Sequence, residues 1–220
     1  MDVVPAPSAA PLPRGRHAAP RRVVWESQRG RMLAAMAAAV GEKGYAEVAV
    51  ADVISRARVS RKTFYEQFDN KLGCFLAAYD AGVEVILAAI DEAIADAGAD
   101  PVAIATAGTR RYLETLAANP AFARTFLVEV LAAGPEALDR RTTVHERFAT
   151  QLAEIHRAAC GQVPDCPELP PHTFRACVGA IHELVTDHVI HRGAESLPEL
   201  LGLIVEIERS LLLAPVSPGA

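Results

Sequence analysis

The chain has 220 residues, of which 51% are hydrophobic, 5% are aromatic and 22% are charged. This length allows one or two domains with a substantial core, and the abundance of alanine favours helix over strand. The longest uninterrupted apolar run, residues 33–40, is far shorter than the roughly 20 residues that a bilayer span needs. These features predict a soluble globular protein and argue against a membrane protein.

Residues 1–24 are rich in proline, alanine and arginine and show no periodicity, which predicts a disordered arm. The arm lacks the continuous apolar segment of a signal peptide, so we expect a cytoplasmic protein. Cys74, Cys160, Cys166 and Cys177 are neither dense nor in CxxC spacing. We therefore expect reduced thiols and neither a disulfide framework nor a zinc site.

Charge is divided unevenly along the chain. Residues 1–75 hold twelve lysines and arginines against seven acidic residues, whereas residues 76–220 hold ten against twenty. A basic N-terminal third on an acidic remainder indicates that the N-terminal end meets a polyanion, although chance clustering of surface charges would look similar.

Helical spacing of apolar residues accounts for most of the chain after residue 24. The expected helices cover a segment around residues 32–40, two short helices between 44 and 71, and then 72–98, 101–119, a short helix after Pro120, 136–160, 172–192 and 197–213. A proline-rich loop is expected over 163–171. No convincing alternating strand is present, so the predicted fold class is all-α.

Two helix starts carry specific signals. Asp100 followed by Pro101 reads as an N-cap and a proline at the first helical position. Ser196 and Glu199 have the spacing of a capping box, which predicts that the last helix opens there.

Residues 44–71 have the spacing of two short helices joined by a tight turn, as in a helix-turn-helix. Ser60 is placed to cap the second helix, and Phe64 and Phe68 share its buried face. The outward face is cationic and rich in hydrogen-bonding groups; it consists of Arg61, Lys62, Thr63 in part, Tyr65 and Gln67.

This segment strongly resembles the DNA-binding domain of the TetR (tetracycline-repressor-like) family. The matching residues are Gly44-Tyr45, Asp52-Val53, Ala57, Val59-Ser60, Thr63-Phe64-Tyr65, Phe68 and Lys71. Arg58 stands where the family usually has glycine, which requires a left-handed backbone at a cost of order 1 kcal/mol or a shifted turn. Ala49 stands where the family tends to have Thr or Ser, and this forfeits a cap of about 0.5–2 kcal/mol.

The resemblance implies a recognition helix over about 60–68 in the major groove of DNA. Arg61 and Lys62 are the expected base readers, Thr63, Tyr65 and Lys71 match phosphate-contacting positions, and Arg58 adds a phosphate contact. The full expected DNA-binding set is Arg58, Ser60, Arg61, Lys62, Thr63, Tyr65, Gln67 and Lys71. The arginines of the N-terminal arm either enter a minor groove or make only diffuse electrostatic contact.

The same resemblance implies a domain at 25–71 that binds DNA and a helical domain at 72–215 that binds an effector and dimerises. The last two helices, about 172–213, are the expected homodimer interface. The acidic excess of this region favours a mainly apolar effector that is neutral or cationic. Its expected contacts are Tyr79, Arg111, Tyr112, Phe126, Phe148 and His182.

We therefore predict a DNA-binding transcriptional regulator, a homodimeric repressor that binds a palindromic operator and is released by a small molecule. No catalytic motif, cofactor or metal site is expected; His182, His188 and His191 do not share one helix face as three metal ligands would. Three alternatives remain open: an activator, a different helix-turn-helix DNA binder without an effector, and an all-helical enzyme whose basic end is incidental.

Overall fold

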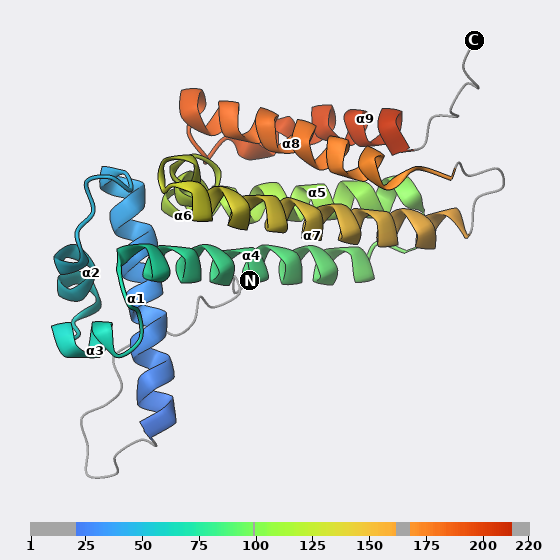
Figure 1. The fold of residues 1–220 in the computed structure, drawn as a ribbon. Helices are drawn as coiled ribbons and strands as arrows, with labels where there is room; N and C mark the ends of the chain where they lie inside the picture. Colours follow the sequence, from blue (N-terminus) through green and yellow to red (C-terminus); the bar gives the residue numbers. More distant parts are fainter. Residues whose placement is uncertain (1–20, 99, 162–167, 213–220) are drawn as a thin grey trace.

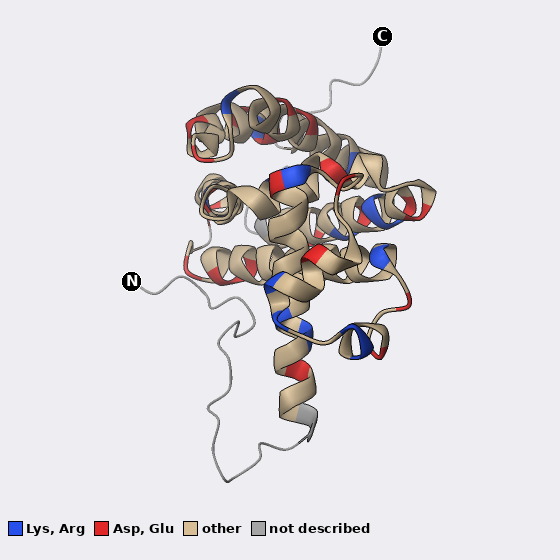
Figure 2. Ribbon diagram, turned by 90° about the vertical axis from the view of Figure 1, so that its left-hand side faces the viewer, with Lys and Arg blue, Asp and Glu red and all other residues tan. Residues whose placement is uncertain are grey.

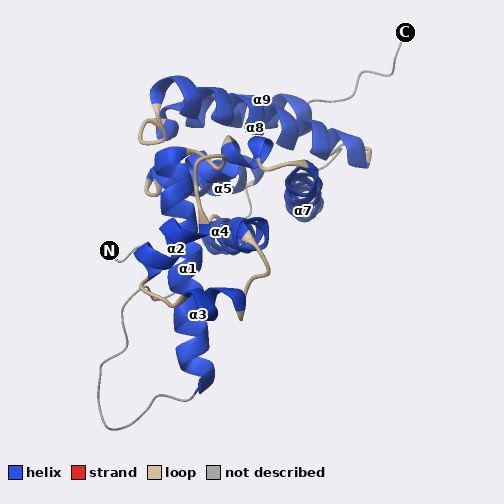
Figure 3. Ribbon diagram, turned by 60° about the vertical axis from the view of Figure 1, so that its left-hand side comes forward, coloured by secondary structure: helices blue, strands red, loops and turns tan. Residues whose placement is uncertain are grey.

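The computed structural model describes residues 21–98, 100–161 and 168–212 (Figure 1). These residues form nine α-helices, two short 3-10 helices and no strand, so the all-α prediction is confirmed for them (Figure 3). Most of the predicted arm lies outside the described residues. Its last four residues do not: they form the start of the first helix, α1, which begins at Arg21.

We call residues 21–70 the head. It contains α1 (Arg21–Lys43), α2 (Val50–Ala57) and α3 (Arg61–Tyr65). The N-terminal turns of α1 extend beyond α3 at the free end of the head (Figure 1). The helix predicted over 60–68 is shorter in the structure, because α3 ends at Tyr65 and the chain continues as a turn, in which the amide of Phe68 still donates to the carbonyl of Phe64 at 2.9 Å.

We call residues 71–212 the body. Its helices are α4 (Lys71–Ala95), α5 (Pro101–Ala117), α6 (Pro120–Leu127), α7 (Pro135–Cys160), α8 (Pro171–Arg192) and α9 (Leu201–Leu212). In Figure 1, α8 and α9 form one layer, α5 and α7 lie beneath it, and α4 lies beneath these two. The 3-10 helices Glu129–Ala132 and Leu197–Leu200 follow α6 and precede α9, respectively.

One of the two predicted helix starts is confirmed. The carboxylate of Asp100 accepts hydrogen bonds from the amides of Val102 and Ala103, which caps α5. The prediction of a capping box at Ser196 is wrong, because the Ser196 hydroxyl instead pairs with Nε2 of His188 at 2.8 Å. A 3-10 turn therefore opens the last segment, and α9 starts only at Leu201.

Helix α4 is long and apolar enough to cross a membrane by length and composition, and it is the only such helix among the described residues. The search of the sequence for long uninterrupted apolar runs did not identify α4 as a candidate span, because a few charged residues interrupt its apolar sequence. More than half of its most apolar stretch is buried against the other helices of the protein. We therefore assign α4 as a core helix of the bundle.

One hydrophobic cluster runs through both head and body. It contains Met32 and Val40 from α1, Phe64 from α3, Phe75 from α4 and Leu113 from α5. The two parts also approach closely between α1 and α6, where the Thr125 hydroxyl donates to the carbonyl of Ala37 at 3.2 Å. The head is thus packed against the body through α1, α4 and α6.

The cysteines differ from the prediction of four reduced thiols. Cys74 and Cys177 are free and buried, as expected, and burial raises the pKa of each thiol to about 12. Cys160 is disulfide-bonded, so the prediction is wrong for this residue. Cys166 lies outside the described residues.

Candidate nucleic-acid interface and ligand pocket

The turn between α2 and α3 takes the first of the two predicted alternatives, a left-handed backbone at Arg58. Arg58 has φ 52° and ψ 48°, and it is the only non-glycine residue with positive φ in the described part of the chain. The amide of Val59 then donates to the carbonyl of Ile54 at 3.2 Å, which closes the end of α2. The Arg58 side chain remains exposed beside α3.

At the start of α2, the Asp52 carboxylate accepts from the amide of Ala49, while the cap that Thr or Ser would provide at this position is absent, as predicted. Ala49 offers no side-chain cap, but its amide donates to Asp52 at 2.9 Å. Asp52 also accepts from Nζ of Lys43 at 2.7 Å, and this hydrogen bond lowers the pKa of Asp52. The charge of Lys43 is therefore engaged within the head.

Helix α3 is capped as predicted. The Ser60 hydroxyl accepts from the amide of Thr63 at 3.0 Å and pairs with its hydroxyl at 2.8 Å. Phe64 is fully buried, which turns Arg61, Lys62 and Tyr65 outward. The arrangement presents two cations and a phenol at the surface, with the Arg61 guanidinium 5.7 Å from the Tyr65 ring centroid.

Lys71 and Gln67 of the expected DNA-binding set contact residues that are distant in the sequence. The ammonium of Lys71 donates to the carbonyl of Tyr45 at 2.9 Å and lies 4.2 Å from the centroid of its ring. The Gln67 side chain is half-buried and turns toward α1, where Nε2 lies 3.4 Å from the carbonyl of Trp25. Both side chains are thus held by contacts within the protein, so neither is free in the way that the resemblance implied.

Positive charge gathers on the head. Figure 2 shows lysine and arginine on α1 and α3, whereas acidic positions are spread over the body. This distribution follows from the uneven charge of the sequence. It leaves the exposed face of α3 in a region suited to a polyanion.

A buried carboxylate connects the head to the body, and sequence reasoning did not identify it. Glu129, the first residue of the 3-10 helix after α6, accepts from the amide of Tyr45 at 2.8 Å and from Nε of Arg124 at 3.2 Å. Gly44, with φ +82°, brings the chain close enough for this contact. The sequence signal that could have identified Glu129 is its position as a single acidic residue among apolar residues after α6.

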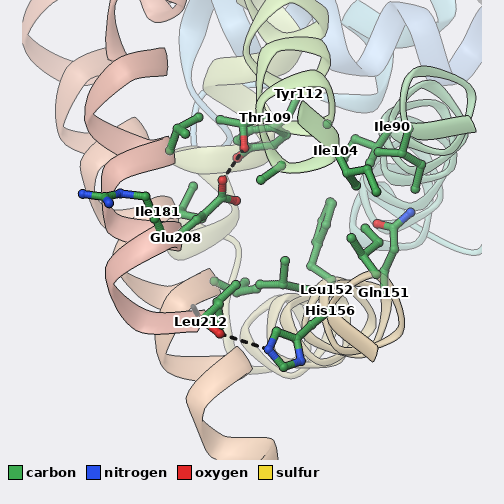
Figure 4. A pocket seen from close by; sticks show the side chains of 18 of the residues that line it. Ile90, Ile104, Thr109, Tyr112, Gln151, Leu152, His156, Ile181, Glu208 and Leu212 are labelled. Carbon is green, nitrogen blue, oxygen red and sulfur yellow. Dashed lines mark hydrogen bonds between the residues drawn. The ribbon is translucent and has the colours of Figure 1, made fainter. Parts of the chain in front are cut away.

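The body encloses a pocket of about 140 Å³ with mainly apolar walls (Figure 4). Side chains from every helix α4 to α9 line it. Of the six expected effector contacts, Tyr112, Phe126, Phe148 and His182 lie in its wall. Tyr79 is instead buried against Phe126, and Arg111 lies on the exposed face of α5, so neither lines the pocket.

Two imidazoles meet at one part of the pocket wall. The ring centroids of His145 and His182 are 4.4 Å apart, and Nε2 of each ring is buried without a hydrogen-bond partner. Burial lowers the pKa of His145 to about 4 and that of His182 to about 3. Both rings are therefore neutral at physiological pH, with unused hydrogen-bonding capacity.

Glu208 of α9 is an acidic side chain of the pocket wall, and it was not among the residues predicted from the sequence. The residue is 7% exposed, and it accepts a hydrogen bond from the hydroxyl of Thr109 at 2.9 Å. Burial raises the pKa of Glu208 to about 7. The available signal was its position one helical turn after buried Ile204, where the pattern required an apolar residue.

The apolar stripe predicted for the last helix divides between two roles. Leu197 and Ile204 are fully buried within their own chain and are not available to a partner. The exposed large apolar side chains of α8 and α9 are Ile190, Leu203 and Leu211. A partner that covers this surface would contact these three residues.

The fold and the α2–α3 geometry define a helix-turn-helix protein with a helical body that contains a mainly apolar pocket. Residues 32–78 match the model of the family described as bacterial regulatory proteins, tetR family. The chain is 30% identical over 124 residues to the HTH-type transcriptional regulator EthR of Mycolicibacterium smegmatis, and the match covers 56% of each chain. The chain thus aligns with little more than half the length of this curated relative.

Solved structures share the fold over a larger part of the chain. The fatty acid degradation regulator FadR from Bacillus halodurans has a TM-score of 0.72 at 19% identity, covering 84% of this chain and 94% of that one. FadR from Bacillus subtilis in complex with stearoyl-CoA gives 0.71 at 18% identity, covering 83% and 96%. Residues 32–78 therefore form a DNA-binding domain of the tetR family of bacterial regulatory proteins, and the chain shares the fold of these solved structures. The matched family consists of transcriptional regulators, which argues against the enzyme alternative.

Proposed function

We propose that the chain is a cytoplasmic transcriptional repressor that binds a palindromic DNA operator as a homodimer and leaves it when a small molecule fills the body pocket. The observation that carries the DNA-binding part is the outward face of α3. A buried Phe64 and a capped N-terminus hold Arg61, Lys62 and Tyr65 toward solvent on the basic head. Arginine and lysine in this setting read guanine and contact phosphates.

The pocket supports the effector part of the proposal. Phe126, on α6, lines the pocket, while the same helix contacts α1 of the head through Thr125. A ligand that shifts α6 therefore acts on the element that holds the head. The B. subtilis FadR complex with stearoyl-CoA is a case in which a protein of this fold holds a ligand with a long apolar chain.

The test is a titration of the full-length protein against the DNA that flanks its gene, compared with half-sites and scrambled duplexes. We expect tight binding to one palindrome, and affinity that falls steeply with salt because phosphate contacts release counterions. Equal affinity for half-site and palindrome, or a flat salt response, would contradict the proposal. An activator would bind the same DNA but raise transcription from the adjacent promoter.

Lys62 and Tyr65 are expected to play different parts in operator binding. Lys62→Ala should relax the preference at one base position by about 1–3 kcal/mol if the contact is bidentate. Tyr65→Phe should weaken binding evenly across sequences, because a phosphate contact carries little sequence information. Binding-site selection on both variants measures this, with Arg110→Ala on the exposed face of α5 as control. Identical sequence profiles for the two head variants would refute the assignment.

The exposed apolar side chains of α8 and α9 are expected to support the dimer. Ile190 is 54% exposed and Leu203 is 50% exposed, so the double change Ile190→Glu and Leu203→Glu should leave the protomer folded. It should yield monomers in sedimentation velocity, because charges then face the partner. Leu138→Glu, an equivalent change at an exposed leucine of α7, should leave the dimer intact. A double variant that remains dimeric would place the interface elsewhere.

A further inference from the structure

The carboxyl group of Glu208 is an acid buried in an apolar setting with a single neutral partner. Figure 4 shows it reaching from α9 to Thr109 of α5, with Gln151 and Ile90 on the opposite wall. The hydrogen bond from Thr109 is 2.9 Å long. Within the described residues, Glu208 forms no ion pair, so no lysine, arginine or histidine of the protein neutralises it there.

An acid in this position requires either a proton or an external cation. A carboxylate loses much of its hydration on burial, and one hydroxyl donor replaces only part of it. The raised pKa of Glu208, about 7, reflects this desolvation. A positively charged group that enters the pocket would hold the carboxyl group in its ionised form and gain a short-range ion pair in a low-dielectric site.

The basic side chains that line the pocket offer little to an anion. The guanidinium of Arg209 is exposed and binds both carboxylate oxygens of Glu206, at 2.7 and 3.2 Å. His145 and His182 are neutral because burial lowers their pKa values. Nε2 of His156 is occupied by the carbonyl of Leu212 at 3.0 Å.

We propose that the body pocket selects an amphiphilic organic monocation, such as a primary amine on an apolar chain, whose charged nitrogen pairs with Glu208. The apolar chain packs against the isoleucines of α4 and α5. The side chain of His182 is 5% exposed and its Nε2 has no partner, so it provides a hydrogen bond to a neutral polar group of such a ligand. This inference rests on the proposed function, in which this pocket is the effector site, and it assigns the ligand class of that site.

The test compares three probes of equal chain length but different charge: octylamine, 1-octanol and octanoate. Calorimetric titration at pH 8 on the full chain should give a dissociation constant for octylamine at least tenfold below that for 1-octanol, with octanoate weakest. Glu208→Gln keeps the size of the side chain and removes its charge. It should abolish the preference for the amine while leaving 1-octanol binding within about threefold.

Glu154→Gln is the matched control, because Glu154 is an exposed acid of α7 outside this pocket. It should retain the full preference for octylamine, which separates a local ion pair from the general acidity of the body. Retained 1-octanol binding shows that Glu208→Gln is folded. Octylamine that binds no tighter than 1-octanol to the wild type, or a preference that survives Glu208→Gln, overturns the inference.

Operator release is measured separately and distinguishes the two proposals. Octylamine that binds through Glu208 without changing operator affinity supports the ligand class and contradicts the release mechanism. A different compound that releases the operator while octylamine fails to bind supports the release mechanism and overturns the ligand class.

Discussion

Replacing Glu208 with glutamine is expected to raise the free energy of unfolding at pH 8 by about 3 kcal/mol. The folded-state pKa of Glu208 is about 7, against an ordinary value of 4.5. Between these two values the unfolded chain has released a proton that the folded chain retains, so wild-type stability falls as pH rises through this window. Glutamine has the same shape and no proton to lose, so this fall should be absent in the variant.

Chemical denaturation from pH 4 to pH 8 measures this difference. The two proteins should converge near pH 4, where the carboxyl group is neutral in both states. His145 and His182 have lowered pKa values and so cost stability as pH falls below about 6.5, but both proteins share this effect and it cancels in the comparison. A difference between the proteins that stays constant with pH would show that Glu208 is not buried as described.

Gly41→Ala is expected to destabilise the protein by about 1–3 kcal/mol, because α1 and α6 meet there without room for a side chain. A Cβ atom at Gly41 would lie 2.7 Å from Cα of Ala121, which is backbone and cannot rotate away. The helices must separate, even though alanine favours helix by roughly 1 kcal/mol over glycine. Thermal unfolding and operator affinity should both report the change, since α1 belongs to the head.

Gly73→Ala is the matched control for this change. Gly73 lies in the first turn of α4, and a Cβ there would make an ordinary contact at 3.7 Å with Oδ1 of Asn70. This variant should be as stable as the wild type or slightly more so. If Gly41→Ala matched Gly73→Ala in melting temperature, the α1–α6 contact would be looser than described.

Local signals in the sequence predicted most of the head. Ser60 is followed by a phenylalanine four positions later, and both the cap and the buried ring follow from that spacing. The left-handed backbone of Arg58 was one of two alternatives, because the resembled family usually has glycine at this position. Gln67 was assigned to DNA because it lies on the outward face predicted for the helix, and Lys71 because it matches a phosphate-contacting position of the family. Their partners, Tyr45 and the carbonyl of Trp25, lie far away in the sequence.

The body was less predictable because its polar contacts are long-range. Asp100 caps α5 through residues two and three positions on, and this was anticipated. Glu208 reaches Thr109, 99 residues away, and no periodicity connects them. The apolar stripe of the last helix was visible, but whether Ile204 faces its own core or a partner depends on the packing of α5 and α8.

One hydrophobic cluster spans head and body, and this determines how the protein unfolds. It includes Met32, Phe64, Phe75, Val185 and Ile204. Residues that share one close-packed interior lose their contacts together, so head and body should unfold in one cooperative transition rather than in two. Amide protons of α1 and of α8 should then exchange with solvent through the same opening event. The head isolated at residue 70 would lose α4 and α6 from its interior and would not form an autonomous folding unit.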